Sequence, residues 1–218
     1  MYLNTPYKIT YDTEKYPFRR IVSEMLEVWD GDTIPLESLH NLEHYDLLVR
    51  EKDQSTKWHK KYYEKFNQSF FPLYFELIKD LKERFEYEKI IYQKIPTFRV
   101  QLGNGNVAVG QWHKDSAYNH GRTEINFWLP FVNTNEHNTI WMESKEDKGD
   151  FQPYVVKYGE ILVFEGANLQ HGNKPNLSSE TRVSIDFRLV DPEKFVPNES
   201  GSINMNTKFM VGEYFDIT

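Results

Sequence analysis

The first ninety residues of the chain carry apolar side chains at the spacing of amphipathic helices. Between residues 17 and 32, apolar residues recur every third or fourth position, at Phe18, Ile21, Val22, Met25 and Trp29. This spacing predicts a helix that begins at Pro17 and ends at the Asp-Gly-Asp of residues 30–32. Residues 36–49 predict a second helix with a weaker pattern. Residues 56–87 predict one or two further helices, with a break near residues 67–72.

After residue 90 the helical spacing gives way to alternation of apolar and polar residues, which is typical of strands with one buried face. The alternation runs through residues 97–102, 124–131 and 182–189, and residues 160–166 predict a short buried strand that ends at a glycine. The Gly-Asn-Gly-Asn of residues 103–106 predicts a hairpin turn.

Three of these strands carry specific polar or amphipathic side chains opposite the apolar face. These side chains are Arg99 and Gln101, Asn126 and Trp128, and Arg182. A wet cavity inside a barrel accounts for such a face better than bulk solvent does. The sequence therefore predicts a mainly β fold, an antiparallel sandwich or barrel with N-terminal helices packed outside it. We expect a single domain in which residues 1–90 form a helical support, residues 91–191 the β core and residues 192–218 an irregular extension with a closing strand.

Composition narrows the class of protein. The 218 residues suit one domain with a sizeable core, and 39% hydrophobic and 27% charged residues are neither a disordered nor a membrane composition. The formal net charge of −7 argues against general binding to nucleic acid or to anionic membranes. We therefore expect neither nucleic acid nor a membrane as a partner, and the composition does not specify an oligomeric state.

The absence of cysteine removes several kinds of site. Disulfides, thiolate zinc sites, cysteine nucleophiles and iron–sulfur clusters all need a residue that the chain lacks. The first twelve residues have no apolar core of the secretory kind, and no run of about 18 apolar residues is present. A cytoplasmic protein is the resulting expectation.

A candidate metal site lies between the predicted strands. His113 and Asp115 are separated by one residue, so in an extended chain both side chains point the same way. His171 follows the strand of residues 160–166, where the chain turns. Imidazole and carboxylate ligands suit Fe(II), Mn(II) or Zn(II), and two histidines with one carboxylate are typical of non-haem Fe(II) oxygenases. Arg182 begins the next strand on its polar face, eleven positions after His171.

The order His113-x-Asp115, His171 and Arg182 resembles that of the Fe(II)/2-oxoglutarate-dependent oxygenases with a double-stranded β-helix core, a jelly-roll, cupin-like barrel. The segments INFWLPF, TIWMES, GEILVFEGANLQHGN and RVSIDFR resemble the phytanoyl-CoA dioxygenase-like group, and within it the oxygenases of streptomycin and other carbohydrate gene clusters. The resemblance covers about residues 92–190, and the helical first part has no motif that matches.

The resemblance implies a role for each of these residues. His113, Asp115 and His171 would bind the iron, and the guanidinium of Arg182 would pair with the distal carboxylate of 2-oxoglutarate. Three protein ligands leave three positions of an octahedron, two for the keto acid and one for O2. The implied activity is a dioxygenase reaction that hydroxylates or otherwise oxidises a small polar molecule, such as a sugar, a nucleotide sugar, an amino acid or an acyl conjugate, with succinate and CO2 as coproducts. The presence of Asp115 argues against the halogenating branch.

Further residues are weaker candidates. Gln101, Asn126 and Arg99 lie on polar strand faces, where they could contact 2-oxoglutarate or the substrate. Arg188 is a second candidate for a carboxylate contact, although we expect it to form an ion pair with Asp186. Four aromatic residues could line the pocket or simply pack in the core: Trp112, Tyr118, Trp128 and Trp141.

Two other functions stay open at this point. Residues 40–44, HNLEH, fit the inverted zinc-peptidase motif, in which His40 and His44 would bind zinc and Glu43 would act as the base. A cupin-like isomerase or binding protein would use the same fold and metal without O2 chemistry, and only turnover of 2-oxoglutarate separates it from an oxygenase. Three other histidines lie in polar segments, so we expect them to be solvated, with His120 near enough to reach substrate: His59, His120 and His137.

Overall fold

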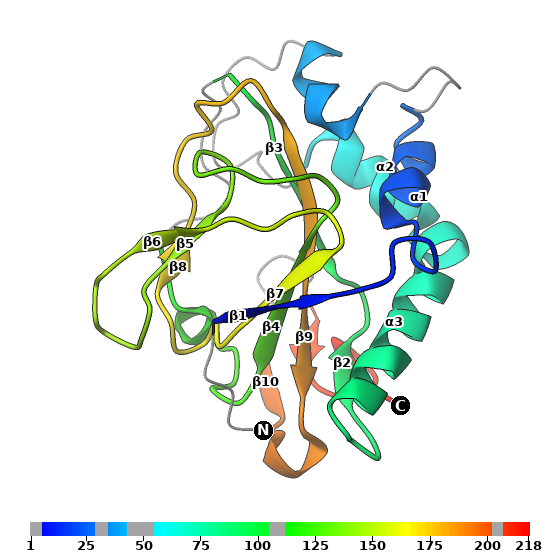
Figure 1. Cartoon of the computed structure of the whole chain (residues 1–218). Helices are drawn as coiled ribbons and strands as arrows, with labels where there is room; N and C mark the ends of the chain where they lie inside the picture. Colours follow the sequence, from blue (N-terminus) through cyan, green and yellow to red (C-terminus); the bar gives the residue numbers. More distant parts are fainter. Residues whose placement is uncertain (1–5, 29–34, 43–54, 105–111, 202–206) are drawn as a thin grey trace.

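The computed structural model describes residues 6–28, 35–42, 55–104, 112–201 and 207–218 of the chain. The described part is mostly β, with its α-helices confined to the first ninety residues (Figure 1). Its largest element is an antiparallel sheet of seven strands, which the helices cover on one face and a smaller sheet covers on the other (Figure 1).

The large sheet has the strand order β1-β7-β4-β9-β2-β12, and β3 pairs with the first half of β9. Its strands are β1 (Tyr7–Thr10), β2 (Ile91–Gln93), β3 (Thr97–Gln101), β4 (Ile125–Pro130), β7 (Glu160–Phe164), β9 (Arg182–Val190) and β12 (Phe215–Ile217). The register places Gln101 opposite Arg182, and Asn126 opposite Arg188. The polar residues of three strands that lie far apart in the sequence therefore share one face of the sheet.

The N-terminal helices pack on the apolar face of the large sheet. They are α1 (Phe18–Met25), α2 (Lys57–Lys65) and α3 (Phe71–Arg84), with a 3-10 helix at Leu36–Asn41. A π-helical turn, Phe66–Phe70, joins α2 to α3 and lies at the predicted break, just before the proline in the first turn of α3. Aromatic rings dominate this core, and one example is the stack of Tyr62 on Phe98 with ring centroids 4.3 Å apart.

Two predicted features of the helical region differ from the structure. The first helix ends at Met25, because Leu26 already closes its last turn, so it is shorter than the spacing suggests. Trp29, the Asp-Gly-Asp of residues 30–32 and the second half of the second predicted helix, residues 43–49, lie outside the described residues. Within 36–41 that second element is a 3-10 helix.

The smaller sheet lies against the opposite face of the large sheet. It has the order β6-β5-β8, from β6 (Gln152–Tyr154), β5 (Ile140–Met142) and β8 (His171–Gly172). A second apolar cluster fills the space between the sheets and consists of Trp128, Ile140, Met142, Val156, Leu162, Phe164 and Leu169. The side chain of Trp128 thus points away from the helices, as the alternation predicts.

The C-terminal residues return to the large sheet. The strands β10 (Asn198–Gly201) and β11 (Lys208–Phe209) pair with each other, and β12 pairs with β2. The predicted closing strand is therefore present. Only the first two residues of the predicted hairpin turn, Gly103 and Asn104, lie within the described part of the chain. In that part, none of the helices has the length and apolar character that crossing a membrane requires.

Candidate metal centre

Backbone pairing brings the two candidate histidines together. His113 and His171 form an isolated antiparallel bridge, in which each N–H donates to the other's carbonyl at 2.9 Å. Asp115 begins a 3-10 helix, Asp115–Tyr118, and its N–H donates to the carbonyl of Gly166 at 2.9 Å. Lys114 between them is extended, so the side chains of His113 and Asp115 face the same way.

The ligand atoms of these three residues lie within 4.8 Å of one another. Asp115 Oδ1 is 3.1 Å from His113 Nε2 and 3.6 Å from His171 Nε2. His171 Nδ1–H donates to the carbonyl of Leu169 at 2.9 Å, which leaves the Nε2 lone pair directed toward Asp115. Within the described residues, this is the one group of three or more acidic or histidine side chains with the spacing of a metal site.

The protonation states of the ligands favour a metal. Burial tends to raise the pKa of the Asp115 carboxyl, but the charge of Arg188 and the hydrogen bond with His113 hold that pKa well below its ordinary value. Burial lowers the pKa of His171 below its ordinary value of 6.5. At neutral pH, Asp115 is therefore a carboxylate and His171 a neutral imidazole, which are the forms that bind a metal.

The three residues open onto a cavity of about 60 Å³ between the two sheets. Arg182 also lines this cavity, with its guanidinium 5.5 Å from the centre of the Trp128 ring and its Nη1–H donating to the carbonyl of Asn138 at 3.1 Å. Arg99 and Asp186 form an ion pair in the wall, with 3.0 Å between Nε and Oδ1. The cavity thus has a metal-ligating end and a buried arginine.

Asn126 and Gln101 lie differently from each other. Asn126 lines the cavity, and its Nδ2–H donates to Asp115 Oδ2 at 2.7 Å. Gln101 is fully buried and donates to the carbonyl of Lys174 at 2.7 Å, and it is not among the residues that line the cavity. A contact of either residue with a cosubstrate stays a prediction.

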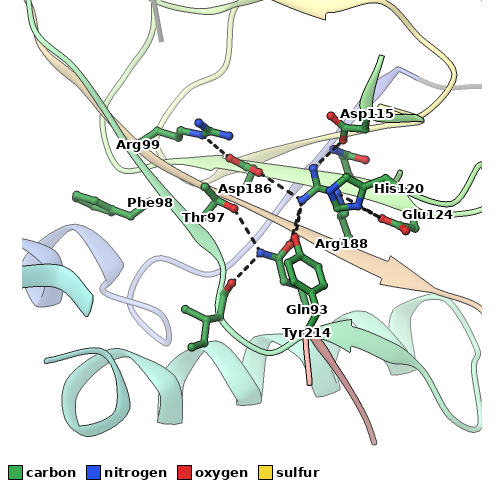
Figure 2. A network of polar contacts seen from close by, with 12 residues as sticks. Gln93, Thr97, Phe98, Arg99, Asp115, His120, Glu124, Asp186, Arg188 and Tyr214 are labelled. Carbon is green, nitrogen blue, oxygen red and sulfur yellow. Dashed lines mark hydrogen bonds and ion pairs between the residues drawn. The ribbon is translucent and has the colours of Figure 1, made fainter. Parts of the chain in front are cut away.

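Arg188 has a partner that the sequence did not indicate. Its Nη2–H donates to Asp115 Oδ2 at 2.7 Å, whereas the predicted ion pair with Asp186 is present at 3.7 Å. Figure 2 shows the guanidinium between Asp115 on one side and Gln93 and Tyr214 on the other. Neither Gln93 nor Tyr214 was predicted, because nothing in the sequence around either residue connects it with Arg188, which is 95 positions from Gln93 and 26 positions from Tyr214.

The predicted aromatic lining is present in part. Trp128 lines the cavity, and the ring of Tyr118 packs edge-on against the ring of His113 with centroids 5.1 Å apart. Trp112 is 38% exposed and contacts Phe151, and the indole of Trp141 donates to the carbonyl of Glu136. Neither of these two tryptophans is in the cavity lining.

Of the three histidines that were expected to be solvated, one is buried and a second is largely shielded from solvent. His59 is 2% exposed, and its ring lies within hydrogen-bond distance of Thr56 Oγ1 and edge-on to Phe98, because it is on the inner face of α2. His120 pairs with Glu124 at 2.7 Å and packs on Phe209, away from the cavity. His137 is exposed as expected.

The competing zinc motif is only partly described. His40 lies in the 3-10 helix and its Nδ1 is 3.0 Å from Thr181 Oγ1, while Glu43 and His44 lie outside the described residues. The same helix accepts a hydrogen bond from the Thr181 N–H at the carbonyl of Glu37. These contacts attach His40 to the start of β9, the strand that carries Arg182.

A larger hollow of about 270 Å³ lies on the opposite face of the large sheet, beside the end of α3. Its inner wall is apolar, with Phe85, Ile125 and Leu189 among the lining residues, and it contains none of the three metal-ligating side chains. The smaller cavity is therefore the candidate site, because chemistry rather than size distinguishes the two.

Comparisons with known proteins identify one relative by sequence and several solved structures by shape. The chain is 36% identical over 210 residues to the streptomycin biosynthesis protein StrG of Streptomyces griseus, and the alignment covers 96% of each protein. Among solved structures, the nickel complex of the non-heme monooxygenase ThoJ has a TM-score of 0.50 at 12% identity over 90% of this chain and 79% of ThoJ, which shows a similar fold. AviO1 from Streptomyces viridochromogenes Tue57 has a TM-score of 0.48 at 14% identity, over 88% of this chain and 91% of AviO1. No profile of a described protein family matches the chain.

Proposed function

The chain belongs to the family of the streptomycin biosynthesis protein StrG, and from that premise we propose that it is a non-haem Fe(II)/2-oxoglutarate-dependent dioxygenase that oxidises a small polar molecule. The observation that carries the proposal is the convergence of His113, Asp115 and His171 at one end of a cavity that Arg182 also lines. A structural cluster of two histidines and an aspartate would have no need of a buried, cavity-lining arginine.

The residues present fit a ferrous ion and a keto acid. Two imidazoles and one carboxylate form the ligand set of this enzyme class, and three ligands leave three positions of an octahedron for other molecules. His113, Asp115 and His171 would hold the iron, which when bound supplies the activation of O2 at the expense of 2-oxoglutarate.

The other residues that line the cavity would bind and orient 2-oxoglutarate and the substrate. Arg182 would pair with the distal carboxylate of 2-oxoglutarate, because a guanidinium presents two parallel N–H donors to a carboxylate. The ring of Trp128 packs beside that guanidinium and shields it from water. The indole N–H of Trp128 donates to Ser184 Oγ at 3.2 Å, which fixes the orientation of the ring. The ion pair of Arg99 and Asp186 offers both a donor and an acceptor to a substrate that carries hydroxyl or amino groups.

The finer architecture belongs to the same proposal. The large sheet and the β6-β5-β8 sheet would be the two halves of a double-stranded β-helix over residues 91–191, with residues 1–90 as helical support and 192–218 as an extension within a single domain. The name of the relative places that protein in antibiotic biosynthesis, which supports a small molecule as substrate. A cytoplasmic location stays a prediction from the sequence.

A metal-binding isomerase or binding protein with the same fold is the second candidate, since the metal ligands alone would serve it equally well. The feature against it is Arg182, a buried guanidinium that lines the same cavity as the three candidate ligands and has the charge and shape to bind a carboxylate. The metallopeptidase interpretation has no support among the described residues, because His40 contacts Thr181 rather than another metal ligand.

The test is formation of succinate. The protein is loaded with Fe(II) and 2-oxoglutarate without oxygen, O2 is admitted, and succinate is measured against a sample without protein. We expect the wild type to form succinate even without its substrate, His113→Ala and Asp115→Ala to form none, and His40→Ala to retain the activity. A wild type that binds iron but leaves 2-oxoglutarate intact would favour the isomerase or binding protein. Loss of activity in His40→Ala with retention in His113→Ala would favour the peptidase.

A further inference from the structure

The carboxylate of Asp115 divides its two oxygens between two kinds of partner. Oδ1 faces His113 Nε2 and His171 Nε2, at 3.1 and 3.6 Å, and is the oxygen on the side of the metal site. Oδ2 accepts hydrogen bonds from Asn126 Nδ2 and Arg188 Nη2, both at 2.7 Å. Asn126 and Arg188 are direct cross-strand partners on β4 and β9. The large sheet therefore presents two adjacent donors to one oxygen.

The guanidinium of Arg188 is itself fixed on its far side. Its Nη1–H donates to Gln93 Oε1 at 3.1 Å and to Tyr214 Oη at 3.2 Å (Figure 2). Gln93 Nε2 donates to the carbonyl of Ile95 at 2.7 Å, which turns the amide oxygen toward the arginine. Two further carboxylates, Glu124 and Asp186, lie 3.5 and 3.7 Å from Arg188. The side chain is thus held from β2, from Glu124 just before β4 and from the C-terminal segment.

Asn126 has little freedom to move. A Cβ at Gly166 would lie 2.6 Å from Asn126 Nδ2, so the amide packs directly on the glycine backbone. The same glycine accepts the N–H of Asp115. Both donors to Oδ2 are therefore placed by packing rather than by contact with solvent.

We infer that Arg188 is a positioning residue for the metal ligand Asp115: together with Asn126 it keeps Oδ2 occupied, so that Asp115 offers the metal Oδ1 alone, and Gln93 and Tyr214 hold Arg188 in place for that purpose. This inference rests on the proposed function, because it requires that Asp115 bind a metal. Its chemical consequence concerns the number of open positions. A carboxylate that turned to bind with both oxygens would take a position that the keto acid or O2 needs.

An arginine suits this role better than a lysine does. Contact with Asp115, Gln93 and Tyr214 at once requires donors at fixed angles on a planar group, whereas a lysine ammonium is a single point of charge. Groups that orient a metal ligand in this way typically change metal affinity by about 10- to 100-fold when they are removed.

The experiment is an anaerobic titration with Co(II) alone, followed by visible absorption, on the full chain and on Arg188→Met, Arg188→Lys and Tyr214→Phe. We expect the dissociation constant for Co(II) to rise about 10- to 100-fold in Arg188→Met, with an altered Co(II) spectrum because the Asp115 carboxylate is no longer oriented. Arg188→Lys should restore the charge but only part of the affinity and spectrum. Tyr214→Phe should show a smaller change in the same direction.

The matched control is Arg19→Met. Arg19 makes a two-point pair with Glu37, at 2.8 and 2.7 Å, far from Asp115 in the sequence and attached to a different element. It should lower thermal stability while leaving the Co(II) affinity and spectrum as in the wild type.

Each result decides the matter. Wild-type affinity and spectrum in Arg188→Met, or an equal loss in Arg19→Met, would overturn the inference while leaving the metal site intact. If Arg188→Met does not fold, Tyr214→Phe keeps the arginine, and an unchanged Co(II) affinity and spectrum there would overturn the role of the C-terminal segment in holding it. A wild type that binds no Co(II) would overturn the proposed function itself.

Discussion

Arg182 is the residue on which the proposal of an oxygenase, rather than a metal protein without O2 chemistry, chiefly depends. It is 1% exposed, it begins β9, and one of its donors is taken by the carbonyl of Asn138. A guanidinium presents a planar set of N–H donors that matches the two oxygens of a carboxylate. Arg182 lines the same cavity as the three candidate metal ligands, and under the proposed function it would bind the distal carboxylate of 2-oxoglutarate there.

Substitution of Arg182 by alanine should weaken the binding of 2-oxoglutarate rather than the binding of the metal. We expect the affinity for 2-oxoglutarate to fall by about 2–5 kcal/mol, the usual cost of truncating one member of a buried charge pair. The affinity for Fe(II) should stay near that of the wild type, since Arg182 is not one of the three ligands. Calorimetric titration with 2-oxoglutarate at constant Fe(II), and with Fe(II) at constant 2-oxoglutarate, measures the two affinities. Arg182→Lys should lose less affinity for 2-oxoglutarate than Arg182→Ala does. Equal loss of both affinities would mean that Arg182 supports the fold only.

The site role of a residue could be predicted from the sequence where its partner lies only a few positions away. His113 and Asp115 could be paired because an extended Lys114 between them sends both side chains the same way. The partners of Arg188 could not be predicted in this way. Gln93 and Tyr214 come close to Arg188 only because β2 pairs with β9 on one side and with β12 on the other. His59 was expected in solvent because it lies in a polar, lysine-rich segment, but its side chain is on the inner face of α2 and contacts Phe98 of the β-sheet.

At the scale of elements, β9 shows how one strand serves two purposes. Its odd-numbered residues, from Val183 to Leu189, are buried against the helices, and Arg182, Asp186 and Arg188 on the opposite face line the cavity. A register shift of one residue would move the whole polar row into the helical core. The apolar face therefore fixes the position of every functional side chain on the strand.

Strand β3 gives a test of this division. Phe98 is fully buried and stacks on Tyr62 of α2. Phe98→Ala should lower the free energy of unfolding by about 3–5 kcal/mol, as expected for a large ring removed from a packed core. The control Phe151→Ala removes the same side chain from a half-buried site and should cost clearly less. Denaturant unfolding measures both, and equal losses would contradict the assignment of the buried face.

The elements that alternation could predict were the long, strongly patterned ones. Strands β3, β4, β7 and β9 and the break between α2 and α3 follow directly from spacing. The strands of the smaller sheet are two or three residues long, so no period can be read from them, and β1 consists of four residues with one buried. Such short strands form because a neighbouring strand supplies hydrogen-bond partners. The local sequence does not indicate which strand will be the neighbour.

For the whole molecule, buried histidines determine how stability depends on pH. Burial and the nearby charge of Arg99 lower the pKa of His59 from 6.5 to about 4. Its neutral form is the one that the folded state accommodates, whereas the unfolded chain protonates near the ordinary value. Stability from this group is complete above pH 6.5 and is lost as the pH falls toward 4.

We expect the free energy of unfolding to decrease by about 3 kcal/mol between pH 6.5 and pH 4 on account of His59. His171, whose pKa is also lowered, acts in the same direction in the metal-free protein. His59→Gln should remove the contribution of His59 to the dependence of the free energy of unfolding on pH. His137→Gln, at an exposed position, should leave that dependence unchanged. Urea unfolding across this range is the measurement, and a wild-type slope in His59→Gln would contradict the account.

The most direct test of the central claim is equilibrium binding of Fe(II) without oxygen, with bound iron measured for the wild type and for His113→Ala, Asp115→Ala and His171→Ala. The account predicts one Fe(II) per chain in the wild type and a loss of affinity of more than about 100-fold in each variant, since losing a ligand should exceed the effect of losing a group that only orients one. His137→Ala should bind as the wild type does. Wild-type iron binding in any of the three ligand variants would contradict the claim that these side chains hold a single metal ion.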